Sequence, residues 1–366
     1  MQRVVLFIIF QLACLCGRVS VSAKTDTVGI RSVDVTFHNA DTIHFSGTLT
    51  LPEGRRRSPA IVIISGSYPQ NRDGMMAGHP VYKQIAEYLS HRGYAVLRVD
   101  DRGVGGTNGV YEKCTTEDFA KDAIAAVEYL KTRKDIKRRS IGILGHSEGG
   151  ASGSIAASRC KDIAFFISAA GLMTDGLSSV IQQNYDIVHT TKALSDYDKA
   201  RYDSINKIMF RLCYQYADAD SATLSGALWK AYDEWTRQDT ARFARDFPGK
   251  FDHFRFPIYS FALNATSPWY RFFIRYNPEK YLSKVNIPVL AINGTKDVMV
   301  NCRQNLGNVR RYLAHDKDVT TVAIDGINHL LLPCETGTQQ EYRSIKAPVS
   351  DKVLSTIYEW LRKRFR

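Results

Sequence analysis

The stretch that decides the fold is Gly-Ile-Leu-Gly-His-Ser-Glu-Gly-Gly, residues 142–150. It places a serine, Ser147, between two glycines, Gly145 and Gly149, directly after a run of apolar residues. This G-x-S-x-G pattern is typical of a nucleophilic serine on a sharp turn between a strand and a helix. Because glycine and serine are common residues, the pattern also arises by chance, so its meaning depends on the rest of the chain.

Apolar segments on both sides of this motif alternate between strand-like and helix-like patterns. Residues 60–64, for example, form a continuous apolar run, as expected of a strand that is buried on both faces. Strands that alternate with helices in this way predict an α/β fold, with a mostly parallel central sheet and helices on both faces. Strands are expected at 31–37, 44–50, 60–64, 94–99, 141–144, 163–167, 287–292 and 319–324, and helices at 82–91, 115–130, 304–313 and 353–361.

The alternation stops between residues 173 and 280. This stretch is rich in aromatic and charged residues, has a helical pattern and shows no strand alternation. We therefore predict one domain in two parts, residues 24–172 and 281–366, with a helical cap inserted over residues 173–280. The chain is long enough for one large domain with such an insertion.

The first residues predict a signal peptide over residues 1–23. An apolar run at residues 4–15 follows a basic residue and is followed by small residues at 21–23. The run is too short for a stable membrane-spanning helix. A lipoprotein signal that ends at Cys14 or Cys16 is the alternative, but the residues before these cysteines lack the usual aliphatic position. We expect export to the periplasm or out of the cell.

Composition disfavours several classes of function. The chain has 49 Lys and Arg against 37 Asp and Glu, but its basic runs at 55–57, 137–139 and 362–364 are not interleaved with aromatic residues, so no nucleic acid partner is expected. The cysteines beyond the signal peptide show no zinc-binding spacing, so neither a metal nor a cofactor is expected. These cysteines are Cys114, Cys160, Cys213, Cys302 and Cys334.

Two later strands end in residues that could activate Ser147. A serine hydroxyl is a poor nucleophile unless a histidine takes its proton and a carboxylate orients that histidine. Asp297 follows the strand expected at 287–292, and His329 follows the strand expected at 319–324. Because parallel strands end at the same edge of a sheet, we predict a catalytic triad of Ser147, Asp297 and His329.

Neighbouring residues offer weaker alternatives for these roles. Asp325 could be the acid, but its place four residues before His329 is more typical of a carboxylate that braces a loop. His146 adjoins the serine, yet on a sharp turn its side chain points away from the nucleophile, so we expect it to pack in the interior.

An oxyanion hole needs main-chain N–H groups directed at the developing negative charge. The residue after the nucleophile, Glu148, supplies one of them in this arrangement. The other is expected from the loop after the strand at 60–64, with Ser67 as the first choice and Tyr68 as the second.

Several motifs in register resemble those of the α/β-hydrolase fold, and more narrowly those of bacterial carboxylesterases and their peptidase-like cousins. Members carry an SGSGPQDRDG-like oxyanion loop, a D-x-R-G-x-G loop and a GHSEGG turn. Tyr68 replaces a glycine that is usual in the first motif, which could narrow the acyl pocket or add a hydroxyl donor. In this chain the motifs are SGSYPQNRDG at 65–74, DDRGVGG at 100–106, GHSEGG at 145–150, NGTKDVMV at 293–300 and GINHLL at 326–331.

The resemblance implies a serine carboxylesterase that cleaves short-chain acyl esters through an acyl-enzyme, with a small-molecule ester as its substrate. A peptidase is the alternative; an aminopeptidase would need a carboxylate for the substrate amine, and Asp218 and Asp220 are candidates. A catalytically silent binding protein on the same fold is the third possibility.

Two further expectations concern single residues. Gln182, Gln183 and Tyr185 open the insertion and are candidates for lining the substrate pocket. Cys302 and Cys334 each lie five residues beyond a predicted triad member, so they could form a disulfide that pins the two loops, or remain two small buried thiols. Nothing in the sequence indicates an oligomeric state.

Overall fold

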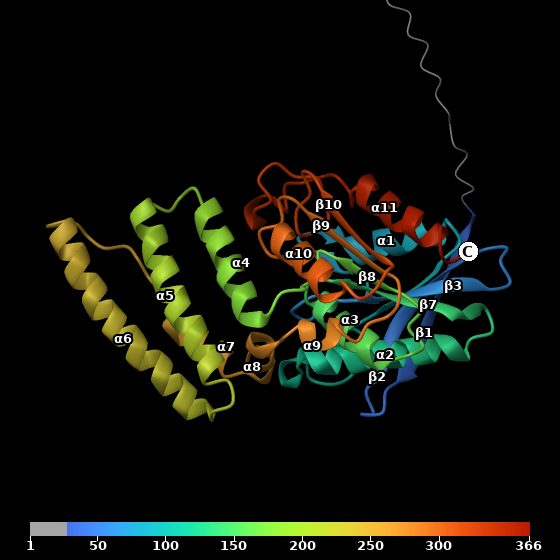
Figure 1. Cartoon of the computed structure of the whole chain (residues 1–366), viewed down its shortest axis with the longest axis horizontal. Helices are drawn as coiled ribbons and strands as arrows, with labels where there is room; N and C mark the ends of the chain where they lie inside the picture. The colour runs from blue at the N-terminus through green and yellow to red at the C-terminus, as the bar shows by residue number, and fades with distance from the viewer. Residues whose placement is uncertain (1–27) are drawn as a thin grey trace, which may run out of the picture.

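A computed structural model describes residues 28–366. The signal peptide predicted over residues 1–23, including Cys14 and Cys16, lies outside the described residues. An eight-stranded sheet forms the centre (Figure 1), and its strand order is β1-β2-β6-β3-β7-β8-β9-β10. The strands are β1 (Ile30–His38), β2 (His44–Pro52), β3 (Ser58–Ile64), β6 (Ala95–Val99), β7 (Ile136–His146), β8 (Phe166–Ala169), β9 (Val289–Gly294) and β10 (Val319–Ile324).

The strand directions confirm the predicted mostly parallel sheet. β2 pairs antiparallel with β1 and with β6, and the strands from β6 to β10 run parallel to one another. β8 begins at Phe166, three residues later than the expected start, because residues 163–165 are irregular even though Ala164 donates to Ile141 of β7. A short hairpin of β4 (Met75–Met76) and β5 (His79–Pro80) was not predicted.

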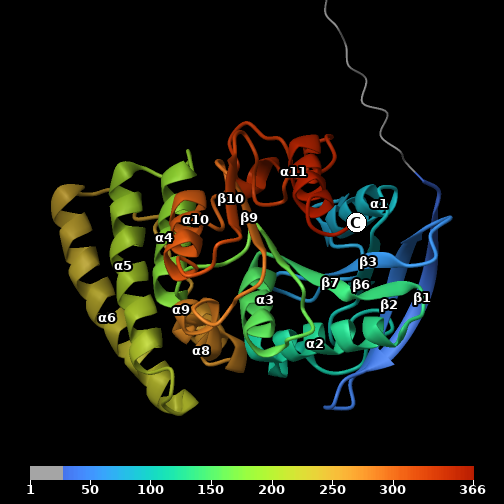
Figure 2. The same ribbon diagram turned by 45° about the vertical axis from the view of Figure 1, so that its right-hand side comes forward.

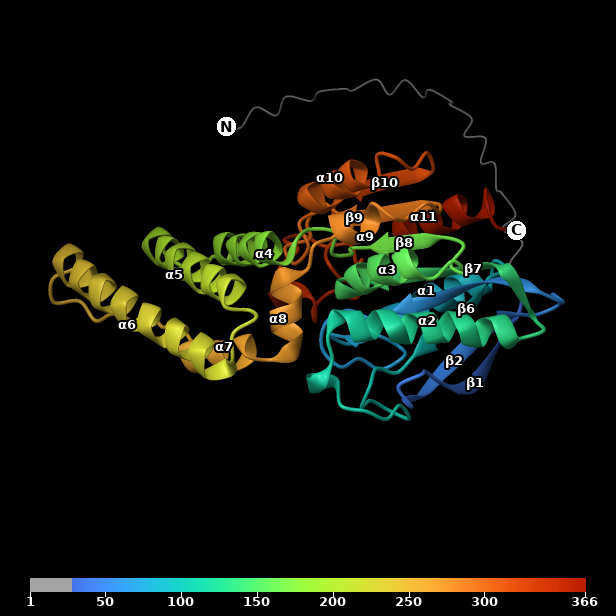
Figure 3. The ribbon, with the colours of Figure 1, turned by 60° about the horizontal axis from the view of Figure 1, so that its bottom comes forward.

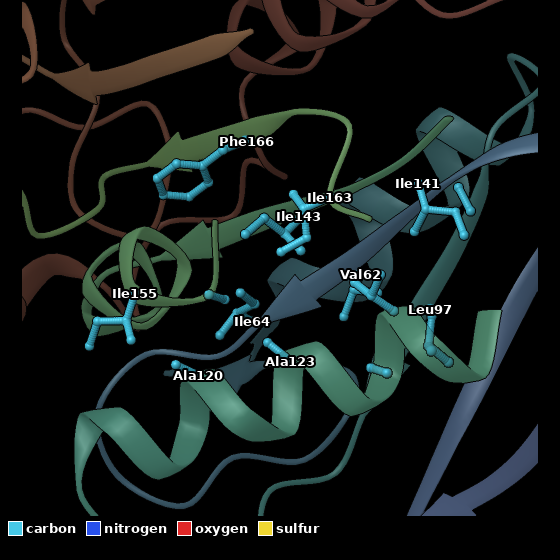
Figure 4. Close-up of a cluster of buried hydrophobic side chains, with 14 of the residues drawn as sticks. Val62, Ile64, Leu97, Ala120, Ala123, Ile141, Ile143, Ile155, Ile163 and Phe166 are labelled. Carbon is cyan, nitrogen blue, oxygen red and sulfur yellow. The ribbon is translucent and has the colours of Figure 1, made fainter. Parts of the chain in front are cut away.

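Helices cover both faces of the sheet, because every central strand is apolar on both sides. Figure 2 shows α2 (Thr116–Thr132) and α3 (Glu148–Arg159) on one face of the sheet, and Figure 4 shows Val62 and Ile64 of β3 on that face. Ile61 and Ile63 face the opposite layer, formed by α1 (Val81–Ser90) and α11 (Asp351–Arg362). α10 (Cys302–Tyr312) lies on the same side as α2 and α3. The sheet is therefore buried throughout its centre.

Helices between β8 and β9 form the cap. In Figures 1 and 3 the helices α4 to α7 extend from one side of the sheet and α8 lies between them and the core. They enclose a hydrophobic cluster of their own, whereas α9 packs with Tyr281 and Leu282 into the core. The helices are α4 (Gly176–Thr190), α5 (Asp196–Gln215), α6 (Ser221–Asp246), α7 (Ile258–Ala265), α8 (Pro268–Arg275) and α9 (Glu279–Leu282).

None of the helices formed by residues 28–366 has both the length and the apolar character needed to cross a membrane.

Candidate active site

Ser147 stands on a sharp turn between β7 and α3, in a strained backbone conformation with φ 56° and ψ −124°. The two glycines of the motif permit this turn. A Cβ atom on Gly145 would lie 2.0 Å from the carbonyl oxygen of Gly149, and a Cβ atom on Gly149 would lie 2.3 Å from that of Ile64. Only glycine fits at both places, so the local sequence forces the serine out at the end of the strand.

The structure brings the three residues of the predicted triad together. His329 Nε2 lies 3.0 Å from Ser147 Oγ, and His329 Nδ1 lies 2.9 Å from Asp297 Oδ2. Both distances are hydrogen-bond distances, in the order that general-base activation of a serine requires.

Asp297 is fixed by its own loop. Its side chain is fully buried, and its second oxygen, Oδ1, accepts main-chain N–H groups of Met299 at 2.9 Å and Val300 at 2.8 Å. Oδ2 is therefore left for the imidazole. Asp325, the alternative acid, accepts the hydroxyl of Thr295 at 2.8 Å and makes no hydrogen bond to His329.

His146 packs in the interior and connects two parts of the site. Its Nε2 lies 2.9 Å from the carbonyl oxygen of His329, so Nε2 carries the proton, and Nδ1 accepts from Tyr82 Oη at 3.3 Å. Tyr82 Oη in turn accepts the N–H of Gly66 at 3.0 Å. Burial lowers the pKa of His146 to about 3, which keeps the ring neutral. Tyr82 was not singled out from the sequence, because a tyrosine on a buried helix face carries no signal of such a role.

The loop after β3 lies against the nucleophile. A Cβ atom on Gly66 would approach the Cβ atom of Ser147 to 2.9 Å. Among the described residues, the main-chain N–H groups of Ser67, Tyr68 and Glu148 have no hydrogen-bond acceptor, which leaves all three available to an oxyanion. The choice between Ser67 and Tyr68 as the second donor stays a prediction.

Two carboxylates, the partly buried Asp101 and the buried Glu148, hold this loop in place. Asp101 accepts the hydroxyl of Ser65 at 2.5 Å and the N–H of Gln70 at 2.8 Å. Glu148 accepts the hydroxyl of Ser67 at 2.6 Å. Burial raises the pKa of both carboxyl groups, that of Asp101 to about 7. Their surroundings thus favour the neutral form, which the donated hydrogen bonds oppose.

A cavity of about 920 Å³ opens above Ser147 and His329 and extends between the core and the cap. Among the described residues that line it, none carries a carboxylate, a lysine or an arginine side chain. The cavity therefore suits an uncharged ligand. Its lining combines aromatic, aliphatic and amide side chains: Tyr68, Val180, Gln183, Asn184, Ile187, Val188, Tyr202, Asn206, Phe210, Phe256, Phe261, Asn264, Trp269, Tyr270 and Phe273, among others.

The structure corrects two of the predicted substrate contacts. Gln183 and Tyr68 line the cavity, but Gln182 and Tyr185 do not. α4 presents to the cavity the face that carries Asn184 and Ile187, and the opposite face carries Gln182, bonded to Asp186, and Tyr185, stacked on His189. The sequence showed a helix but not its orientation around its axis.

The remaining expectations for single residues also have clear positions. All five described cysteines are free, so the bridge between Cys302 and Cys334 is not formed; their thiols contact the carbonyl groups of Asn293 and Gly326 respectively. Asp218 pairs with Arg275, and Asp220 caps the start of α6; neither lines the cavity. Within residues 28–366, no group of three or more histidine, cysteine or acidic side chains could hold a metal ion.

The chain matches known proteins along most of its length. The model of the X-Pro dipeptidyl-peptidase (S15) family matches residues 41–329. The chain belongs to this family. Among curated proteins it is similar to the esterase EstD of Thermotoga maritima, with 24% identity over 322 residues. That alignment covers 87% of this chain and 65% of EstD, so the chain spans less than two thirds of this relative.

Solved structures with a similar fold have low sequence identity. The esterase Pf2001 of Pyrococcus furiosus superposes with a TM-score of 0.53 at 15% identity, over 91% of both chains. The α/β-hydrolase GrgF of Penicillium sp. sh18 gives a TM-score of 0.54 at 16% identity, over 91% of this chain and 98% of the other. At such identities the likeness establishes the fold alone, and that fold is the α/β-hydrolase fold.

Proposed function

We propose that this protein is a serine esterase that hydrolyses uncharged carboxylic esters through an acyl-enzyme. The observation that carries the proposal is the hydrogen-bonded series Ser147–His329–Asp297 at one end of a cavity without charged side chains.

The geometry suggests a role for each group. His329 takes the proton of Ser147 as Oγ attacks the ester carbonyl carbon, and the N–H groups of Glu148 and Ser67 stabilise the resulting oxyanion. When the intermediate collapses, the bond to the alcohol oxygen breaks, and His329 gives its proton to the leaving alcohol. Water, deprotonated by His329, then attacks the acyl-enzyme and releases the acid. Asp297 keeps the imidazole in the required tautomer throughout.

Peptide cleavage is the second candidate, because the family is that of X-Pro dipeptidyl-peptidases. An enzyme that removes dipeptides must recognise the free ammonium group of its substrate, which calls for a carboxylate or a comparable acceptor in the pocket. No carboxylate lies among the described residues that line this cavity. This lining favours esters over peptides with a free amino terminus.

The size of the cavity argues for a substrate larger than the short acyl esters expected from the sequence. About 920 Å³ lies near the upper end of the range for sites that bind drug-sized molecules. We propose that a bulky uncharged acyl or alcohol group occupies the cap side of the cavity, while Ser147 acts at the other end.

Kinetics with p-nitrophenyl acetate, butyrate and octanoate test this function, with X-Pro anilides in parallel. We expect a burst of p-nitrophenol followed by steady turnover, at least ~10³-fold loss in Ser147→Ala, and anilide cleavage that is negligible beside ester cleavage. Ser158→Ala, which removes a hydroxyl bonded only to the carbonyl of Ile155, is the matched control. Anilide cleavage that rivals ester cleavage would favour the peptidase, and no turnover of either substrate would favour a silent binding protein.

Export is part of the proposal and rests on the pattern of residues 1–23. Cell fractionation of the full chain in a bacterial host tests it: we expect a shortened protein outside the cytoplasm. A protein of full length that stays in the cytoplasm would contradict it.

A further inference from the structure

The side chain of Glu148 joins three segments at the boundary between core and cap. It is only 2% exposed and does not line the cavity. Its Oε2 accepts the hydroxyl of Ser67 at 2.6 Å, and its Oε1 accepts the hydroxyl of Thr116 at 2.6 Å and the indole N–H of Trp269 at 2.8 Å. These donors come from the loop after β3, the first residue of α2, and α8 of the cap.

All three donors are neutral, and no arginine or lysine pairs with this carboxylate among the described residues. Burial raises the pKa of Glu148, so without a cation its carboxyl group stays charged only while these three hydrogen bonds keep their geometry. The positions of Ser67 and Trp269 are therefore set by the same group, and displacement of either one weakens the compensation of its charge.

Ser67 and Trp269, two of the three donors to Glu148, both line the cavity above Ser147. The main-chain N–H groups of Glu148 and Ser67 are the proposed oxyanion donors, so the Ser67–Glu148 hydrogen bond sets the spacing between them. Trp269 lines the cavity, where its ring stacks on Phe273 at 5.0 Å and lies 6.5 Å from the ring of Tyr68. A substrate in the cap side of the cavity therefore touches Trp269, whose indole N–H donates to Glu148.

We infer that Glu148 is a positioning residue whose carboxylate couples the Trp269 wall of the cap to the oxyanion loop at Ser67. The inference rests on the proposed esterase function. It predicts that loss of the Trp269–Glu148 hydrogen bond slows acylation even of a substrate too small to reach the cap.

Trp269→Phe tests the coupling, because it removes the indole N–H and keeps an aromatic wall. With p-nitrophenyl acetate we expect kcat to fall about 10-fold with little change in KM, the effect of one misplaced charge-assisted hydrogen bond. Glu148→Gln should lower kcat by a similar factor, and the double variant should be no slower than the slower single variant, since both break one connection.

Trp235→Phe is the matched control. It removes an indole N–H bonded to Ser204 at 3.1 Å within the same cap, and Trp235 does not line the cavity. We expect it to leave kcat within 2-fold of wild type. If Trp269 were only a wall, Trp269→Phe would raise KM for bulky esters and leave kcat for the acetate unchanged, which would overturn the inference. Additive losses in the double variant would overturn it too.

A second measurement separates this inference from the proposed function. A fluorophosphonate forms a bond between Ser147 Oγ and phosphorus as fluoride leaves, and its phosphoryl oxygen needs the same N–H donors without any ester turnover. The labelling rate should fall about 10-fold in Trp269→Phe and stay at the wild-type value in Trp235→Phe. Equal rates in all three proteins would overturn the coupling even if wild type hydrolysed no ester.

Discussion

Carboxylates beside the nucleophile and carboxylates in the cap both lie where several segments meet, but their charge is compensated differently. Beside the nucleophile, Asp101 and Glu148 receive hydrogen bonds only from neutral hydroxyl and N–H groups, whereas Asp100 and Asp122 elsewhere in the core pair with arginines. In the cap, Asp239 pairs with Arg201 at 2.5 Å, and both side chains are 3% exposed. The Arg201 guanidinium also pairs with Asp252 at 2.5 Å and lies 4.1 Å from the ring centre of Phe254.

The two kinds of compensation suit two tasks, the positioning of catalytic loops and the joining of cap helices. Neutral donors hold a carboxylate at a defined place, which suits loops that must keep catalytic groups in register. The ion pairs of the cap instead tie α5 to α6 and to the segment before α7, and none of their residues lines the cavity. Substitution of Asp101 or Glu148 should therefore change catalysis, and substitution of the cap ion pairs should change stability and the choice of substrate.

The largest effect is expected at the triad. In Asp297→Asn, the amide oxygen must accept the N–H groups of Met299 and Val300, which turns the NH₂ group toward His329 and favours the wrong tautomer of the imidazole. We expect kcat for the acetate ester to fall ~10³- to 10⁴-fold with little change in KM. Asp325→Asn is the control, and a comparable loss in that variant would move the acid to Asp325.

The next effect is expected in the cap. Arg201→Met removes the buried cation that Asp239 shares with Asp252 and leaves Asp239 only the half-exposed Arg242 as a partner, so the free energy of unfolding should fall by about 3 kcal/mol. Urea unfolding and limited proteolysis should show the cap opening first, while the folded fraction still hydrolyses the acetate ester. Arg245→Met removes a solvent-exposed pair with Asp246 and should change nothing measurable. Loss of acetate hydrolysis in step with cap unfolding would show that the core depends on the cap.

The core could be predicted from sequence because its signals are local. An apolar run such as residues 60–64 marks a strand, and the glycines beside Ser147 mark the turn that exposes it. Asp297 and His329 could then be found because strand ends in a parallel sheet meet at one edge. Asp101 lies in a recognisable loop motif, but its hydrogen bonds to the loop after β3 were not predicted.

The side-chain contacts of the cap could not be predicted, because they join residues that are far apart in the sequence. Nothing near Glu148 indicates that Trp269, 121 residues later, donates to its carboxylate. In α4 the helical pattern was visible, yet its orientation depends on packing against α5 and α8, so Gln182 and Tyr185 were assigned to the wrong face. Whether Cys302 and Cys334 form a disulfide depends on the distance between their sulfur atoms, which their positions in the sequence do not give.

A smaller effect should appear in the pH dependence of stability. Because burial raises the folded-state pKa of Asp101 to about 7, the folded protein holds this proton where the unfolded chain has lost it. The contribution of Asp101 to stability is therefore full below the ordinary carboxyl pKa and is lost as pH rises toward 7. The negative charges of the nearby Asp122 and Glu148 carboxylates also raise the pKa of Asp101.

Unfolding of wild type and Asp101→Asn at pH 5 and pH 8 checks this. We expect wild type to lose on the order of 1–2 kcal/mol more than the variant between these values, after allowance for partial solvent access to Asp101. Subtracting the two profiles removes the contribution of His146, which is the same in both proteins. The lowered pKa of His146 makes stability rise with pH, opposite to the effect of Asp101. Parallel pH profiles would mean that Asp101 keeps an ordinary pKa in the folded state.

The smallest effect distinguishes the two faces of α4. Tyr185 is 45% exposed and stacks on His189 outside the cavity, so Tyr185→Ala should change kcat/KM for p-nitrophenyl octanoate by less than 2-fold. Ile187, two residues along, lines the cavity. Ile187→Ala should raise KM for the octanoate about 5-fold and leave KM for the acetate unchanged, because only the longer chain reaches this side chain.

A loss in Tyr185→Ala that matched the loss in Ile187→Ala would mean that the substrate approaches along the outer face of the cap. An unchanged KM in both variants would place the acyl chain against the core and leave the cap side of the cavity to the alcohol.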